Sequence, residues 1–227
     1  MCGRFSLWLE LTDLIKAFPD FVFPNEMAPR YNIAPTQSIA VVTNNPDRNV
    51  EFFRWGLIPS WAKDPEIGSR MINARSETVN EKPSFRAAFR RRRCLILADG
   101  FYEWQKVPGS KSKTPMYIRM KNGRPFAFAG LWEIWQPDTT PVLSCTILTT
   151  KPNALLAPIH NRMPVILPED HYDNWLETPE TERHALQDVL QPYDPAFMTA
   201  YPVSTVVNNP RNDVPDCVMP VNQIMSS

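Results

Sequence analysis

A cysteine at position 2 offers chemistry that no internal cysteine has. Removal of Met1 would make Cys2 the first residue, and its α-amine, with a pKa of roughly 7.7–8.0, would be partly unprotonated near neutral pH. The amine and the thiol can then condense with an aldehyde: the amine forms an imine, and the thiol adds to the imine carbon to close a five-membered thiazolidine ring. Cys2 alone does not decide between this chemistry and an incidental cysteine at a frayed chain end.

Two further titratable residues stand in apolar stretches, where burial would change their chemistry. Glu103 lies in GFYEWQ, and strand alternation would place it on the opposite face from Tyr102 and Trp104. A carboxyl group on an enclosed face resists ionisation and can act as a general acid or base near neutral pH, whereas on an open face it is an ordinary surface glutamate. His160, in APIHNRMPVIL, is the best histidine for proton transfer, although a lone histidine beside a strand is often structural.

A local excess of positive charge lies between residues 70 and 93. The charged residues in it are Arg70, Arg75, Lys82, Arg86 and Arg90 to Arg93, against Glu77 and Glu81. Trp61 stands just before this stretch, in a loop where it is harder to explain as a core residue. Arginines that hold phosphates and rings that stack on bases are typical of single-stranded nucleic-acid binding. A solvated basic run ahead of a strand explains Arg90 to Arg93 equally well.

The composition limits the classes of protein to which the chain can belong. Its 227 residues are 43% hydrophobic, which suits one domain with a sizeable core. Lys+Arg and Asp+Glu both number 24, so any nucleic-acid site must be a local patch. We find no apolar run near the ~20 residues that span a bilayer, no secretory signal, and no zinc or disulfide spacing among the cysteines. We therefore expect a reduced, cytoplasmic protein.

The elements that must position these residues are mostly short strands. Nine runs rich in Val, Ile, Phe and Tyr predict strands at 39–43, 50–55, 94–98, 101–106, 116–120, 126–132, 144–150, 164–167 and 202–207. Turns are expected at Asp99-Gly100, in 109–115 and at Asn122-Gly123. Helices are expected at 11–18, 168–176 and 179–190. Strands and helices do not alternate, so we predict an α+β fold, one domain over 1–227 built on a curved, largely antiparallel sheet or barrel.

Seven motifs together resemble the SRAP family, the SOS-response-associated peptidase domain of abasic-site shielding proteins. They are MCGRF at the start, RYNIAP (30–35), WGLIPSW (55–61), NARSET (73–78), ADGFYEW (98–104), IHNRMP (159–164) and PVSTVVN (202–208). Each motif is weak by itself, but the seven follow the order of the family from residue 2 to about residue 220.

The resemblance implies an activity and a set of residues. Proteins of this family bind single-stranded DNA, or a single-strand/double-strand junction, at an abasic site, and link covalently to C1′ of the ring-opened sugar. The catalytic residues that it implies are Cys2, Asn73, Glu103 and His160. The DNA contacts that it implies are Arg4, Pro35, Trp61, Arg75, Thr149 and Arg162. The family is also credited with releasing its own Met1.

The resemblance also implies what the reaction does not need. No metal, redox or small-molecule cofactor and no membrane takes part, and we expect a monomer. Family members carry a second aromatic residue after the tryptophan of the loop at which strands part, whereas Trp61 is followed by Ala62. The resemblance therefore implies capture of an abasic site more firmly than preference for a junction.

Two other classes of function remain open from the residues alone. In a cysteine peptidase, Cys2 would be the nucleophile, His160 its base, and Glu103 or Asn73 the residue that orients the base. In a non-catalytic single-strand binder, Cys2 would be incidental. Only the aldehyde chemistry needs both the amine and the thiol of Cys2, so blocking the amine separates it from the other two.

Overall fold

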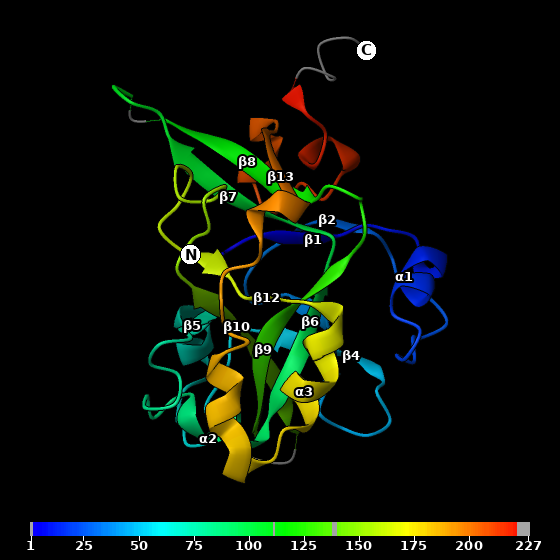
Figure 1. Cartoon of the computed structure of the whole chain (residues 1–227), viewed down its shortest axis with the longest axis vertical. Coiled ribbons are helices and arrows are strands. Elements are labelled where there is room, and N and C mark those ends of the chain that lie inside the picture. The colour runs from blue at the N-terminus through cyan, green and yellow to red at the C-terminus, as the bar shows by residue number, and fades with distance from the viewer. Residues whose placement is uncertain (1, 111, 138–139, 222–227) are drawn as a thin grey trace.

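Two β-structures stacked along the long axis make up the body of the molecule (Figure 1). The structure, a computed structural model, describes residues 2–110, 112–137 and 140–221. Within these residues, one β-structure is an antiparallel sheet with the strand order β13-β8-β7-β1-β2, and the other is a closed barrel with short strands at its rim. The prediction of an α+β fold on a largely antiparallel sheet or barrel is therefore confirmed.

The antiparallel sheet carries the beginning of the chain. Its strands are β1 (Phe5–Leu7), β2 (Arg30–Ile33), β7 (Gly100–Lys106), β8 (Lys113–Met120) and β13 (Met198–Pro202). On one side β1 pairs with β7, where Phe5 lies opposite Phe101, and on the other side it pairs with β2. The backbone N–H of Tyr102 donates to the carbonyl of Arg4 at 3.0 Å. The residues that precede β1 therefore run along β7.

The barrel closes because β10 pairs with strands on both of its sides. Its wall consists of β3 (Ser38–Thr43), β4 (Val50–Trp55), β6 (Arg93–Ala98), β9 (Phe126–Trp135) and β10 (Val142–Thr150). β10 runs parallel to β4 and antiparallel to β9, and β3 and β6 complete the ring. Three short strands extend the wall: β5 (Asn73–Arg75), β11 (Met163–Pro164) and β12 (Ile166–Leu167).

Aromatic rings join the sheet to the barrel. The Phe5 ring of β1 lies edge-on to Trp55 and to Phe128, with centroid distances of 5.1 and 5.8 Å, and Phe101 meets Phe128 at 6.0 Å. All four side chains are fully buried. Truncation of such a ring to alanine typically costs about 3–5 kcal/mol, so this contact holds β1, and the chain start just ahead of it, firmly against the barrel.

The helical segments are short and lie at the periphery. The α-helices are α1 (Leu11–Ala17), α2 (Arg86–Arg91) and α3 (Tyr172–Glu177). The 3₁₀ segments are Pro65–Arg70, Glu169–His171, Glu180–Gln187, Pro195–Phe197, Thr205–Asn208 and Pro215–Cys217. Within the described residues, none of these helices has the length and apolar character that crossing a bilayer requires.

Two local predictions were wrong, each for a physical reason. Asp99-Gly100 does not close a hairpin, because β6 joins the barrel while β7 joins the antiparallel sheet; Gly100 is required at this crossing since a Cβ there would lie 2.2 Å from the Tyr117 ring. The strand expected at 202–207 ends at Pro202, and Ser204 caps a 3₁₀ turn instead. Arg93 fits neither of the two interpretations offered for Arg90 to Arg93, because it is buried and its guanidinium donates to carbonyls that include Trp175 O at 2.6 Å.

Candidate active site

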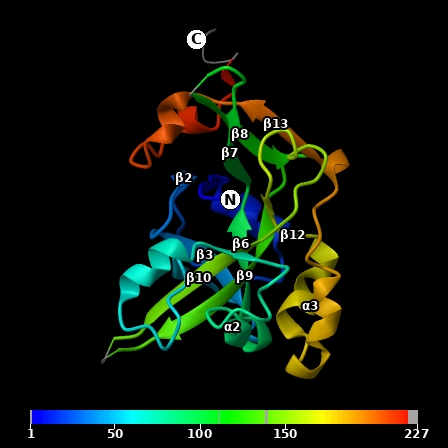
Figure 2. The ribbon, with the colours of Figure 1, turned by 90° about the vertical axis from the view of Figure 1, so that its left-hand side faces the viewer.

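The four residues predicted to be catalytic come from four separate segments and meet where the sheet faces the barrel. Cys2 precedes β1, Asn73 begins β5, Glu103 lies in β7, and His160 lies in the loop before β11. Figures 1 and 2 place the N-terminus at this level, between β7 above and β10 below. The Asn73 Nδ2 donates to the Cys2 carbonyl at 2.7 Å, and the His160 Nε2 lies 4.0 Å from the Glu103 Oε2.

The Cys2 side chain is enclosed and uncharged. Its exposed fraction is 0%, and its thiol points toward the carbonyl of Arg4 with an Sγ–O distance of 3.9 Å. Burial raises the pKa of the thiol well above its ordinary value, and the nearby Glu103 carboxylate raises it further. The sulfur is therefore a thiol at neutral pH and must lose its proton during any reaction that it undergoes.

The Glu103 carboxyl group is poised between its two protonation states. The alternation of β7 turns it away from the face of Tyr102 and Trp104, and only 4% of the residue is exposed. Burial raises its pKa from 4.5 to about 7. At neutral pH, both the acid and its conjugate base are therefore present in useful amounts.

The backbone of Arg162 holds the His160 ring through Nδ1. The Arg162 N–H lies 3.1 Å and the Arg162 carbonyl 3.2 Å from Nδ1, so this nitrogen meets a donor when it is unprotonated and an acceptor when it carries a proton, and Nε2 is the nitrogen that faces Glu103. The ring is held there by a turn in which the His160 N–H donates to the Leu156 carbonyl at 2.8 Å. Burial lowers the pKa of His160, so the ring is mostly neutral at pH 7.

Asn73 contributes an acceptor that no described residue satisfies. Its Nδ2 is occupied by the Cys2 carbonyl, while its Oδ1 is buried and has no hydrogen-bond partner within residues 2–110, 112–137 and 140–221. A buried acceptor of this kind is uncommon in a folded protein. An N–H or O–H group of a bound substrate, or the α-amine of a mature Cys2, would satisfy it.

Three predicted DNA contacts form a cluster beside this site. Arg75 is exposed at the end of β5 and lies opposite the buried Thr149 of β10. Arg162 donates through Nη2 to the Thr149 carbonyl at 2.5 Å and to its hydroxyl at 3.3 Å. Thr149 therefore acts as the anchor between the two arginines.

Comparison with known proteins agrees with this geometry. A sequence profile of the family described as SOS response associated peptidase (SRAP) matches residues 1–210. This chain belongs to the SRAP family. The Bacillus subtilis "Abasic site processing protein YoqW" is 49% identical over 222 residues, which cover 96% of this chain and 99% of that protein. The Rattus norvegicus "Abasic site processing protein HMCES" is 32% identical over 275 residues, 99% of this chain and 77% of that protein.

A solved structure supports the same family fold. The crystal structure of a Bacteroides thetaiotaomicron protein superimposes with a TM-score of 0.86 at 26% identity, covering 97% of this chain and all of the other. The resemblance recognised from the seven motifs is therefore confirmed at the level of family and fold.

One charged residue of the SRAP site was missed by sequence reasoning. Glu77 holds the guanidinium of Arg162 in a bidentate ion pair, with distances of 2.6 and 2.9 Å. This hydrogen-bonded arginine holds the pKa of Glu77 below its usual range. The acidic charge of Glu77 within the otherwise basic stretch around NARSET was the sequence signal that could have revealed it. A phosphate that approaches Arg162 must compete with Glu77.

The two residues expected at the parting of strands lie in loops. Pro35 follows β2 and is half-buried, while Trp61 follows β4 and is 58% exposed. Ala62, where other SRAP proteins are expected to carry a second aromatic residue, is buried against Ile58 and Trp135. Trp61 therefore presents an exposed ring on this loop, while Ala62 packs into the interior.

Within residues 2–110, 112–137 and 140–221, no group of three or more His, Cys, Asp or Glu side chains is arranged to hold a metal ion. The polar groups around Cys2 are an amide, a carboxyl group and an imidazole, of which the carboxyl group and the imidazole can transfer protons.

Proposed function

We propose that this SRAP protein captures abasic sites in single-stranded DNA through Cys2, after loss of Met1. The observation that carries the proposal is the convergence of Asn73, Glu103 and His160 on an enclosed Cys2. The names of the relatives, which are abasic site processing proteins, support the same class of lesion. The adduct would shield the lesion from strand cleavage and from error-prone bypass.

The covalent step balances without an external reagent. The free α-amine of Cys2 adds to the C1′ aldehyde of the ring-opened sugar to give a carbinolamine, which loses one water to become an imine. The thiol then adds to the imine carbon: the sulfur forms the S–C1′ bond, and its proton passes to the nitrogen. The net change is loss of one water and closure of a thiazolidine ring.

The neighbouring residues supply the proton transfers. Protonated Glu103 donates to the departing hydroxyl of the carbinolamine, and its carboxylate then accepts the thiol proton, which the raised pKa of Cys2 makes necessary. His160, through Nε2, assists opening of the sugar ring at O4′. Asn73 orients the start of the chain by holding the Cys2 carbonyl.

The protein would recognise the DNA by its charge and shape rather than by its base sequence. Arg4, Arg75 and Arg162 would contact phosphates around the lesion, with Thr149 holding Arg162 in place. Pro35 and Trp61 would line the place where strands part. An abasic nucleotide has no base to unstack, so its entry into the enclosed site costs less than flipping an intact nucleotide.

The same chemistry bears on removal of Met1. We propose that the site releases Met1 itself, since Glu103 and His160 lie beside Cys2, the residue that follows the bond to be cleaved. A general cysteine peptidase is disfavoured, because burial and Glu103 hold Cys2 as a neutral thiol while such enzymes use a thiolate.

Intact-mass spectrometry with an abasic single-stranded oligonucleotide tests this function. We expect protein without Met1 and, after mixing, one adduct that is heavier by the oligonucleotide minus one water. Acetylation of the mature α-amine should abolish the heat-stable adduct. Cys2→Ser should give only a weaker, imine-type product. A stable adduct that survives acetylation, or functional protein that retains Met1, would show the ring-closure chemistry to be wrong.

A further inference from the structure

The side chain of Arg4 is held on one side by two acceptors. Its Nη1 donates to the Asn32 Oδ1 at 2.6 Å and to the Val207 carbonyl at 2.8 Å. These two bonds use both hydrogens of Nη1. The guanidinium also lies over the Trp104 ring, 5.7 Å from its centroid. An anion that binds Arg4 must therefore approach the opposite edge, which carries Nε and Nη2.

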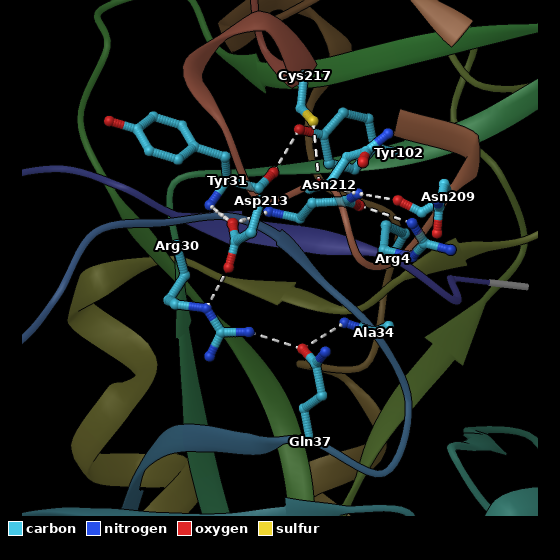
Figure 3. A network of polar contacts seen from close by, with 11 residues as sticks. Arg4, Arg30, Tyr31, Ala34, Gln37, Tyr102, Asn209, Asn212, Asp213 and Cys217 are labelled. Atoms are coloured by element: carbon cyan, nitrogen blue, oxygen red, sulfur yellow. Dashed lines mark hydrogen bonds and ion pairs between the residues drawn. The ribbon is translucent and has the colours of Figure 1, made fainter. Parts of the chain in front are cut away.

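The amide of Asn32 cannot turn around. Asn32 is fully buried, and its Nδ2 faces three carbonyls, those of Asn212 at 2.6 Å, Asn209 at 3.1 Å and Val207 at 3.3 Å. Carbonyls accept only from the NH₂ group, so the Oδ1 of Asn32 is committed to Arg4. Figure 3 shows Arg4 together with Asn209 and Asn212, two of the residues whose carbonyls accept from Asn32.

A carboxylate secures the strand that carries Asn32. Residues 204–218 form a C-terminal clasp that lies over β2. From this clasp, the Asp213 Oδ1 accepts the N–H groups of Tyr31 at 2.5 Å and Asn32 at 2.9 Å, while its Oδ2 accepts from the Arg30 Nε at 2.5 Å (Figure 3). The SRAP profile ends at residue 210, so Asp213 lies outside the matched region.

The free edge of Arg4 carries an unsatisfied donor. Within the described residues, the Nε of Arg4 is buried and has no hydrogen-bond partner. A phosphate oxygen at the Nε–Nη2 edge would satisfy it and form the bidentate contact that arginine favours. Arg4 lies two residues after Cys2, and its carbonyl is held by Tyr102. A fixed Arg4 side chain therefore fixes the distance from a bound phosphate to the reacting sulfur.

We propose that Asn32 is a positioning residue that holds Arg4 with its Nε–Nη2 edge toward a phosphate next to the abasic sugar. Asp213 supports Asn32 from the clasp. The inference rests on the proposed function, because it assumes that Arg4 meets DNA. The inference gives a role to Asn32, a residue that the sequence analysis did not place among the catalytic or DNA-contacting residues.

The test measures binding apart from chemistry. A single-stranded oligonucleotide with a tetrahydrofuran site, which lacks the aldehyde, reports the dissociation constant and its salt dependence. We expect Asn32→Ala and Arg4→Ala each to weaken binding about tenfold and to reduce the slope of log K against log salt by about 0.7, the loss of one single-strand phosphate contact. In the Arg4→Ala background, Asn32→Ala should have no further effect. A merely structural role would give additive losses and an unchanged slope.

Two further variants keep the test decisive. Asn44→Ala is the matched control, because Asn44 also bridges a carbonyl and a donor, Arg91 O and the Trp132 Nε1, at the α2 end of the barrel; it should leave binding unchanged. If Asn32→Ala does not fold, Asp213→Ala replaces it in the test. We expect Asp213→Ala to weaken binding of the oligonucleotide less than Asn32→Ala does, and to have no further effect in the Arg4→Ala background.

The outcomes separate the inference from the proposed function. Additive losses, or wild-type binding by the folded Asn32 and Asp213 variants, would overturn the role of Asn32 while the wild-type adduct still stands. Absence of an adduct with a true abasic oligonucleotide would overturn the proposed function, and the inference with it.

Discussion

Two buried carboxyl groups within ADGFYEW differ in what surrounds them. Asp99 and Glu103 are both 4% exposed, and burial raises the pKa of each. Asp99 accepts hydrogen bonds from the Ser6 hydroxyl at 2.6 Å, from the Leu9 N–H at 2.9 Å and from the Trp8 N–H. These fixed donors favour its charged form and offset part of the burial effect.

Glu103 instead faces groups that can themselves exchange protons. His160 lies 4.0 Å away, and the Cys2 thiol is close enough for the carboxylate to raise its pKa. The comparison shows that burial alone does not distinguish a carboxyl group suited to proton transfer from one with a structural role. Fixed N–H and O–H donors make Asp99 an anchor for the chain around β1, while its titratable neighbours suit Glu103 to the proton transfers that we propose. The following predictions test this contrast.

The largest expected effect is that of Glu103→Gln on chemistry. The amide keeps the shape of the side chain but can neither give up nor take a proton, so we expect the adduct rate at pH 7 to fall about 10²- to 10³-fold. Single-turnover kinetics with abasic single-stranded DNA measure this rate, and binding to the tetrahydrofuran oligonucleotide should be unchanged. A rate within threefold of wild type would assign Glu103 to the same class as Asp99.

Asp99→Ala should lower the stability of the protein and leave the adduct rate nearly unchanged. It leaves buried donors of Ser6, Trp8 and Leu9 without their acceptor, so we expect a loss of about 3 kcal/mol in the free energy of unfolding. Urea denaturation measures this loss. The adduct rate of the remaining folded protein should stay within about fivefold of wild type. A large rate loss in fully folded Asp99→Ala would make Asp99 part of the chemistry and break the contrast.

The difference in stability between wild type and Glu103→Gln should depend on pH in a defined direction. Glu103 titrates near 4.5 when unfolded and near 7 when folded, so the folded state binds more protons between these values. Wild-type stability contributed by this group is therefore present below pH 4.5 and lost as pH rises through 7. Relative to wild type, Glu103→Gln should gain up to about 3 kcal/mol between pH 4 and pH 8. A flat difference across this range would mean that Glu103 has an ordinary pKa.

The smallest effect is expected at the Arg162 ion pair. Glu77→Gln removes the charge that occupies Arg162, so binding of single-stranded DNA should tighten about two- to fivefold, with a salt slope steeper by up to about 0.7. Fluorescence anisotropy at several salt concentrations measures both quantities. Glu81→Gln, which removes a charge from the same basic stretch, is the matched control. Weaker binding by Glu77→Gln would mean that Glu77 orients Arg162 for DNA.

The sequence could predict most of the strands, because their composition and alternation are local, and it could name the four central residues, because seven motifs resemble the SRAP family. It could not predict that β6 and β7 separate into two β-structures, since Asp99-Gly100 has the local signature of a hairpin while the crossing depends on Tyr117 and Ser6. The pairing of Glu77 with Arg162 spans 85 residues. The buried Arg93 likewise depends on carbonyls of residues near 175, which no local pattern reveals.

The enclosed position of Cys2 has a practical consequence for anyone who purifies this protein. An affinity tag fused ahead of Met1 would keep the Cys2 nitrogen in an amide and add bulk next to the hydrogen bond between Asn73 and the Cys2 carbonyl. Under the proposed mechanism, such a preparation would be inert toward aldehydes. A tag joined after residue 227 leaves the Cys2 end of the chain unaltered.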